Sequence, residues 1–212
     1  MTKFFRFGAA GVAMAAALAA APAMAQTNSD TADARAEILS ALTLTVQAGS
    51  ALDFGAVVIQ NSAVAGTLSM GSDGVLDCSD ANLICSGTTD VPVFDVTGGS
   101  ADKWVTINLP TSTYLYLGGT PTVDETQRLT LDNFTSDGTF TAASTDPVLD
   151  AYGNPVLDGL GNPVTVTTPA YYSTQLDSSG EGSFTVGGDL QFDGSEVPGS
   201  YEGTFDVSVD YL

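Results

Sequence analysis

Short runs in which apolar and polar residues alternate recur along the chain after its first 25 residues. Each run is rich in Val, Thr, Leu, Phe and Tyr, and Gly, Asp, Asn or Pro separates it from the next. A period of two residues is typical of β-strands, and no helical period is visible beyond residue 25. Short strands at this spacing predict an all-β protein, an antiparallel sandwich or a barrel, whose sheets have one buried and one wet face. The ten predicted strands are 37–46, 52–59, 66–70, 91–98, 103–110, 113–117, 126–134, 171–176, 182–192 and 200–212.

The run at the C-terminal end keeps its period to the last residues of the chain. Apolar residues and one glycine share one face, and polar residues share the other. Alternation this regular predicts a central strand. The first face carries Tyr201, Gly203, Phe205, Val207, Val209 and Tyr211, and the second carries Glu202, Thr204, Asp206, Ser208 and Asp210.

The alternation in the first predicted strand, 37–46, continues toward the N-terminus through an alanine-rich stretch. Residues 26–37 therefore form a strand-competent extension in front of a β-sandwich domain at 38–212. A loose, exposed leader is the alternative interpretation, because alanine side chains bury little apolar area. The residues that share the inward parity are Ala32, Ala34, Ala36, Ile38, Ser40, Leu42, Leu44 and Val46.

A short repeat interrupts the pattern of strands. Residues 147–154 read PVLDAYGN and residues 155–162 read PVLDGLGN. Asp, Gly and Asn-Pro favour turns, so we interpret about 139–170 as a hairpin-like insertion in the domain. A binding role for the insertion is a further hypothesis.

The first 25 residues have the three parts of a secretory signal peptide. Lys3 and Arg6 precede an apolar stretch, and Ala23-Met24-Ala25 forms a small-x-small cleavage site. A membrane anchor would need about 20 apolar residues, and this stretch is shorter. We therefore predict cleavage before Gln26, with no membrane insertion of the mature chain.

The chain is strongly acidic, with a net charge of −20 that becomes −22 when Lys3 and Arg6 leave with the signal peptide. Such a surface repels phosphate backbones and anionic lipids, which argues against nucleic acid as a partner. Solubility is the simplest interpretation of the carboxylates, and binding of divalent cations is the alternative.

Cys78 and Cys85 are the two cysteines of the chain, and an oxidising compartment favours a disulfide between them. Asp73, Asp77 and Asp80 surround this loop and are weak candidates for calcium ligands. Ordinary turn aspartates explain them equally well, because their spacing does not match an EF-hand loop. We expect no other metal site and no cofactor.

The chain contains no histidine. The most common general base, the Ser-His-Asp triad and the Cys-His pair are therefore excluded. The glycine pairs of the sequence lack the strand-loop-helix context of a phosphate-binding loop. We expect that the protein is not an enzyme.

Four segments together resemble a known family, domain-of-unknown-function family 4402, which occurs in secreted proteins of Gram-negative bacteria. The resemblance covers most of 38–212 apart from the insertion. The segments are LTLTVQAGSALDFGAVV (42–58), LTLDNFTSDG (129–138), GEGSFTVGGDLQF (180–192) and PGSYEGTFDVSVDYL (198–212).

The LDFG element and the C-terminal strand also resemble those of chaperone-usher pilin subunits, including spore-coat-U-like ones. Tyr211 is penultimate and Gly199 is fourteenth from the C-terminus, as in the pilin pattern. The resemblance implies an immunoglobulin-like antiparallel sandwich of about 8–10 strands, whose groove receives the N-terminal strand of a neighbouring copy. It also implies a periplasmic chaperone as a partner.

These features together predict an exported, fimbria-like structural subunit that acts through strand pairing and not through catalysis. Its expected location is the periplasm, the outer surface or the medium of a Gram-negative bacterium. The alternative is a monomeric carbohydrate- or cation-binding β-sandwich module. The candidate assembly residues are Ala32, Ala34, Ala36, Ile38, Gly199 and Tyr211.

Overall fold

The computed structural model describes residues 35–61 and 64–212. The chain divides into two compact units, Met1–Glu37 and Ile38–Leu212, and every described strand lies in the second. The predicted signal peptide lies outside the described residues, as do Ala32 and Ala34.

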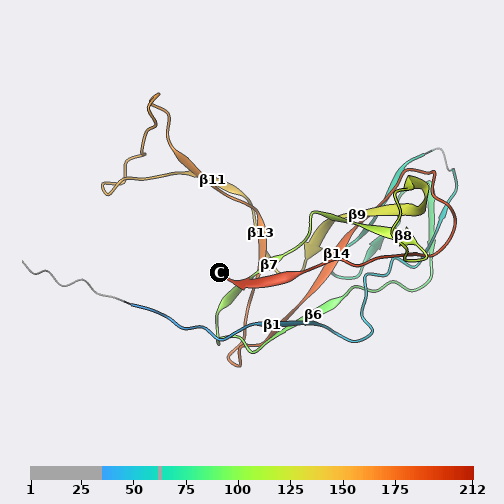
Figure 1. The fold of residues 1–212 in the computed structure, drawn as a ribbon, viewed down its shortest axis with the longest axis horizontal. Coiled ribbons are helices and arrows are strands. Elements are labelled where there is room, and N and C mark those ends of the chain that lie inside the picture. Colours follow the sequence, from blue (N-terminus) through green and yellow to red (C-terminus); the bar gives the residue numbers. More distant parts are fainter. Residues whose placement is uncertain (1–34, 62–63) are drawn as a thin grey trace, which may run out of the picture. The chain divides into compact units, whose positions relative to one another are not determined.

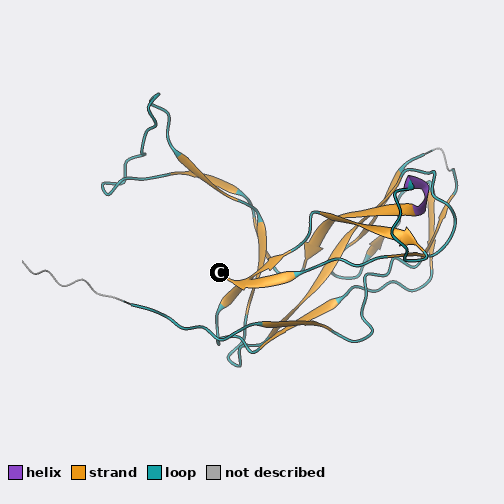
Figure 2. Cartoon of the chain, in the orientation of Figure 1, coloured by secondary structure: helices purple, strands orange, loops and turns teal. Residues whose placement is uncertain are grey.

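Strands make up nearly all the regular structure of the described residues (Figures 1 and 2), and the exception is one 3-10 turn, η1 (Glu125–Gln127). The strands are β1 (Thr43–Val46), β2 (Ala56–Ile59), β3 (Gly66–Met70), β4 (Leu76–Asp77), β5 (Leu83–Ser86), β6 (Val93–Thr97), β7 (Trp104–Asn108), β8 (Ser112–Leu117), β9 (Arg128–Ser136), β10 (Thr139–Thr141), β11 (Ser144–Pro147), β12 (Thr165–Thr168), β13 (Tyr171–Gln175), β14 (Gly182–Phe192), β15 (Tyr201–Glu202) and β16 (Ser208–Tyr211).

The described strands form two main sheets and two ribbons, and all their pairings are antiparallel. The large sheet has the order β1-β6-β14-β9-β8-β15, with β3 and β4 attached through β14. The small sheet has the order β10-β13-β7-β16, and the ribbons are β2–β5 and β11–β12. The prediction of an all-β antiparallel sandwich is confirmed.

The core draws apolar side chains from both sheets. The large sheet contributes Phe94, Leu131 and Phe184, and the small sheet contributes Val105 and Ile107. The Phe94 and Phe184 rings are stacked, with their centroids 5.3 Å apart. Burying one such side chain contributes about 1.5–3 kcal/mol, so the alternating apolar positions hold the two sheets together.

The central strand β14 depends on a glycine pair. Its first half pairs with β6 and its second half with β3 and β9, and the register with β9 shifts between Gly187 and Asp189. A Cβ atom at Gly187 would collide with the backbone at Met70 and Gly71. The Gly187-Gly188 pair therefore serves close strand packing at a bulge.

The C-terminal run is not a central strand, and that prediction is wrong. It divides into β15, which pairs with β8 at the edge of the large sheet, and β16, which pairs with β7 at the edge of the small sheet. Residues 203–207 carry the chain from one sheet to the other. The alternation of apolar and polar residues persists because one face of the segment still packs against the core. Which strands lie beside it in the sheet depends on the tertiary structure and not on this alternation.

Three other predictions of element bounds need correction. The first run forms a strand only over 43–46, and residues 35–42 have no regular structure. The insertion begins later than predicted, because 139–141 is β10 of the small sheet. The short strands β4, β5, β10, β11 and β12 were not predicted, since two to four residues are too few to show a period.

Candidate functional site

A groove of about 610 Å³ opens at one end of the sandwich. Residues 52–59 form one wall, and residues 194–201 form the other. The floor is apolar and comes from the inner face of β8, β9 and β14 through Leu115, Leu129, Leu190 and Phe192.

Both walls contain a strand that pairs on one side only among the described strands. β2 pairs with β5, and β15 pairs with β8. A strand paired on one side presents backbone N–H and C=O groups on the other, which is the geometry that accepts an added strand. The groove therefore combines an apolar floor with two walls that each contain a strand paired on one side only among the described strands.

The LDFG element places the first wall. Phe54 is buried in the core, and Asp53 forms a two-way backbone bridge with Asp90, with N–O distances of 2.9 and 3.0 Å. The Asp53 carboxylate accepts the Gly55 N–H at 2.8 Å. Gly55 has a φ of +70°, and a Cβ atom there would lie 2.6 Å from the Ser86 carbonyl oxygen, so only glycine fits. The chain is thereby turned into β2.

The second wall is fixed by Tyr201 and Glu196. The Tyr201 hydroxyl donates to the carbonyl oxygens of Val197 at 2.7 Å and Thr126 at 3.1 Å. Burial raises the pKa of Tyr201 above its ordinary value, and the Glu196 carboxylate adds to the rise. Glu196 itself accepts the N–H groups of Asp193 and Gly194 at 2.6 and 2.9 Å.

The charges at the groove are acidic. Among the described residues that line it, Asp53 and Glu196 carry the charges, and both already accept backbone hydrogen bonds. The described lining contains Ser200 and Tyr201 but no histidine, cysteine or lysine. The arrangement suits binding of an extended apolar segment.

The structure places the candidate assembly residues in three different settings. Gly199 lies in the second wall, where a Cβ atom would collide with the Leu117 side chain. Ala36 and Ile38 are exposed, and Ile38 is 95 % exposed. Tyr211 lies away from the groove, where its hydroxyl accepts the Ser100 N–H at 2.7 Å and donates to the Ser40 carbonyl at 2.9 Å.

The groove floor was not predictable from the sequence. Leu115, Leu129, Leu190 and Phe192 fall within the predicted strands 113–117, 126–134 and 182–192. No local signal separates an inward residue under a complete sheet from one under a groove. The LDFG element was the one part of the site with a visible motif.

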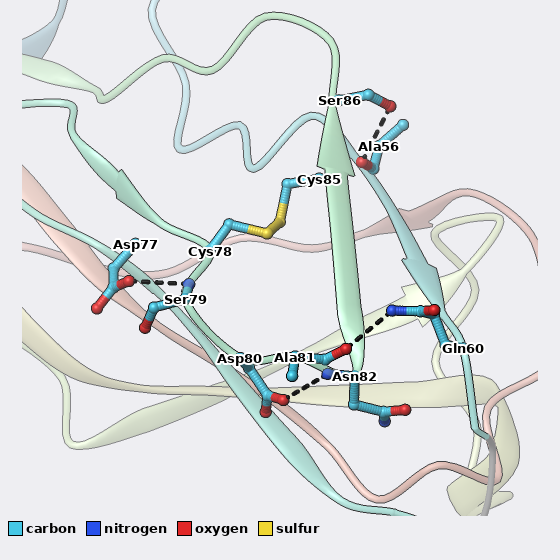
Figure 3. The surroundings of a disulfide bond; sticks show 10 residues. All are labelled: Ala56, Gln60, Asp77, Cys78, Ser79, Asp80, Ala81, Asn82, Cys85 and Ser86. Atoms are coloured by element: carbon cyan, nitrogen blue, oxygen red, sulfur yellow. Dashed lines mark hydrogen bonds between the residues drawn. A yellow bond between two sulfur atoms is a disulfide. The ribbon is translucent and has the colours of Figure 1, made fainter.

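The predicted disulfide between Cys78 and Cys85 is confirmed, with a Cα–Cα distance of 6.2 Å (Figure 3). Its role is wider than closing a loop. Cys85 lies in β5 opposite Val57 of β2, so the bond ties down the strand that supports the first wall of the groove.

Each of the three aspartates near the disulfide caps a turn of its own. The carboxylates of Asp73, Asp77 and Asp80 each accept the backbone N–H two residues ahead, at 3.0, 3.0 and 2.8 Å. Figure 3 shows Asp77 and Asp80 in these separate turns. Across residues 35–61 and 64–212, no group of three potential metal ligands is brought together. The geometry supports the interpretation as turn aspartates.

A second hollow, of about 280 Å³, lies on the large sheet beside Tyr114 and Arg128. The Arg128 guanidinium lies 4.6 Å from the centre of the Tyr114 ring and forms an ion pair with Glu125 at 3.2 Å. A sugar that stacks on tyrosine needs an open ring face. The arginine covers one face of this ring, so the hollow gives little support to carbohydrate binding.

In the part of the chain that the structure describes, no helix is long and apolar enough to cross a membrane.

Comparison with known proteins identifies one family. Residues 44–152 and 156–211 match the family described as "Domain of unknown function (DUF4402)". The match runs through most of the insertion, which was expected to lie outside the resemblance. No curated protein and no solved structure is significantly similar to the chain. Since the matched residues cover well over half of the chain and include both walls of the groove, the chain belongs to the DUF4402 family.

Proposed function

We propose that this protein is an exported structural subunit of the bacterial cell surface that assembles by strand pairing. The groove of one copy receives residues 26–38 of another copy. The observation that carries the proposal is the apolar floor between β2 and β15, two strands whose second edges pair with no described strand. Strand addition at such edges gives affinity through the backbone and specificity through alternate side chains.

The pattern of the N-terminal segment supports this occupant. Leu42 and Leu44 share a parity with Ile38, and both pack against the core of their own domain. Ile38 is 95 % exposed. The apolar positions of this parity therefore extend further toward the N-terminus than the residues that the subunit itself buries. Insertion into a second copy would cover Ile38 and the alanines before it.

Three further features support export and a non-catalytic role. The first 25 residues have the three parts of a signal peptide, and a disulfide is typical of proteins in oxidising compartments. The absence of histidine from the sequence removes the most common catalytic base. An open groove and a strand-competent extension invite aggregation, so a periplasmic chaperone would cover them before assembly.

The proposal is tested with the mature chain from Gln26 and a variant that lacks residues 26–37. We expect concentration-dependent assembly of the mature chain and a monomeric deletion variant, measured by sedimentation velocity and negative-stain microscopy. Ala34→Asp should also prevent assembly, because it places a carboxylate on the apolar parity. Thr31→Asp is the matched control on the polar parity and should leave assembly intact.

A stable monomer would contradict the proposal if it unfolds in one step and if the deletion changes neither its size nor its stability. The alternative, a monomeric carbohydrate- or cation-binding module, would then take its place.

A further inference from the structure

Residues 142–170, called here the 142–170 hairpin, expose nearly all their side chains. β11 and β12 pair with each other and with no other described strand, and all eight of their residues are exposed. Figure 2 shows the loops that continue this ribbon. A two-stranded ribbon without an apolar face against other strands is only marginally stable in water. The hairpin must therefore be held by local interactions or by a partner.

The end of the hairpin is held by a ring of backbone hydrogen bonds. The Val148 N–H donates to Val164, Val164 donates to Val156, and Val156 donates to Val148, at 2.8, 2.8 and 2.7 Å. Each valine follows a proline, so three Pro-Val steps meet in a pseudo-threefold arrangement. This ring fixes the backbone without an apolar core.

Two equivalent turns extend from this ring. The Asp150 carboxylate accepts the N–H groups of Tyr152 and Asn154 at 2.8 and 2.9 Å. The Asp158 carboxylate accepts those of Leu160 and Asn162 at the same distances, 2.8 and 2.9 Å. The repeated sequence thus builds two turns of the same shape, each with a defined outermost side chain.

The outermost side chains of the two turns are apolar. Tyr152 and Leu160 occupy the same position of the repeat, and each is 89 % exposed. Leu149 and Leu157, also equivalent, are 55 and 57 % exposed. Turn tips are ordinarily polar, so large apolar side chains at equivalent positions of two fixed turns are unusual and point to an interaction surface. Aromatic and aliphatic anchors on a preorganised loop bind at a low entropic cost.

The charge of the hairpin indicates the kind of partner. Asp146, Asp150 and Asp158 are its charged residues, and the sequence has no lysine or arginine after Arg128. Because the hairpin carries negative charges and no positive one, the hairpins of two copies would repel each other. A surface that offers apolar pockets between basic side chains is complementary in both respects.

The hairpin is separate from the groove. It joins β10 to β13 at one edge of the small sheet, and no groove-lining residue lies between Thr139 and Leu176. Both surfaces can therefore be occupied in one molecule.

We propose that the 142–170 hairpin is a docking element for a protein partner with apolar pockets rimmed by lysine or arginine, and that Tyr152 and Leu160 are its anchors. This binding function is additional to assembly and does not depend on it.

The test uses a random-peptide library displayed on phage as the probe, selected against the intact mature protein. We expect enriched peptides that combine aromatic or aliphatic residues with lysine or arginine, and we expect salt to weaken their binding. The Tyr152→Ser, Leu160→Ser double variant should lower the affinity of these peptides by about thirtyfold, the size of effect that anchor residues give. Val123→Ser is the matched control, because Val123 is 92 % exposed and lies outside the hairpin.

Four outcomes would overturn the inference. They are no enrichment, enrichment of peptides without basic residues, equal effects of the double variant and the Val123 control, and self-association that the double variant abolishes. The double variant must keep the unfolding temperature of the parent, which we expect because both side chains are exposed. Deletion of residues 26–37 should leave peptide binding unchanged, so failure of the assembly proposal would be seen separately.

Discussion

Aspartate followed by glycine three residues later forms the same turn at Asp150, Asp158 and Asp177. In each turn the aspartate N–H donates to the carbonyl four residues ahead at 2.8 Å, and the glycine N–H donates back to the aspartate carbonyl at 3.0 Å. The glycines have φ values of +82°, +84° and +76°. A type I turn closed by a left-handed residue is a common three-residue hairpin loop, so each turn follows from five residues of sequence.

These turns predict a pH dependence. The pKa of each of the three aspartates is lowered, mainly because the carboxylate accepts the N–H four residues ahead and then the N–H two residues ahead. Since the folded pKa lies below the unfolded pKa, the stabilising effect is present above the unfolded value and is lost as pH falls through the folded value. Carboxyl-carbon NMR titration of the native chain should give lower pKa values for these aspartates than the same titration in urea. Equal values in the two states would show that the turn hydrogen bonds do not persist in solution.

At the scale of elements, the segment from β15 to β16 shows how one strand pattern serves two sheets. Phe205 lies between β15 and β16, and its ring is 4.9 Å from the Phe134 ring and 6.4 Å from the Phe94 ring. It is half-buried, whereas Phe94 and Phe134 are buried. The segment therefore packs on the core through one face while lying at the edge of the fold.

We predict that Phe205→Ala lowers the free energy of unfolding by about 2–3 kcal/mol, less than the roughly 3–5 kcal/mol of a fully buried phenylalanine. Asp206→Ala, on the exposed face, should change it by less than about 0.5 kcal/mol. Urea denaturation followed by circular dichroism measures both variants. Similar losses for the two variants would mean that both faces of this segment are covered.

At the scale of the whole molecule, the disulfide between the two cysteines fits the proposal that the chain is exported, because disulfides persist in oxidising compartments. Cys78 and Cys85 are joined, and no free cysteine is found in the described part of the chain. A single short disulfide stabilises a fold by constraining the unfolded chain, by about 2–3 kcal/mol for a loop of this length. The bond also supports β5, which pairs with β2 of the groove wall.

We predict that intact-mass analysis of secreted protein shows loss of residues 1–25 and of two hydrogens. Alkylation of native protein should add no mass, whereas alkylation after reduction should label both cysteines. A retained leader, or thiols that react in native protein, would contradict the prediction of an exported, oxidised chain.

The bounds of β3 and β14 could be predicted to the residue, as 66–70 and 182–192. Period two, β-branched residues and flanking glycines are local properties, and they decide strand formation wherever one face is buried. The disulfide was likewise predictable from two cysteines close together in the chain, and the membership of the DUF4402 family from four short segments.

The tertiary structure alone decided where each strand lies in its sheet. The C-terminal run alternates like a central strand, yet β15 and β16 are edge strands. The alternation of apolar and polar residues is the same whether a strand pairs with one neighbouring strand or with two. The groove has the same origin. Leu115, Leu129 and Leu190 have the sequence pattern of any core residue, and only the incomplete cover above them makes them the floor of a site. Alternation determined which side chains face inward, and packing between distant segments determined what covers them.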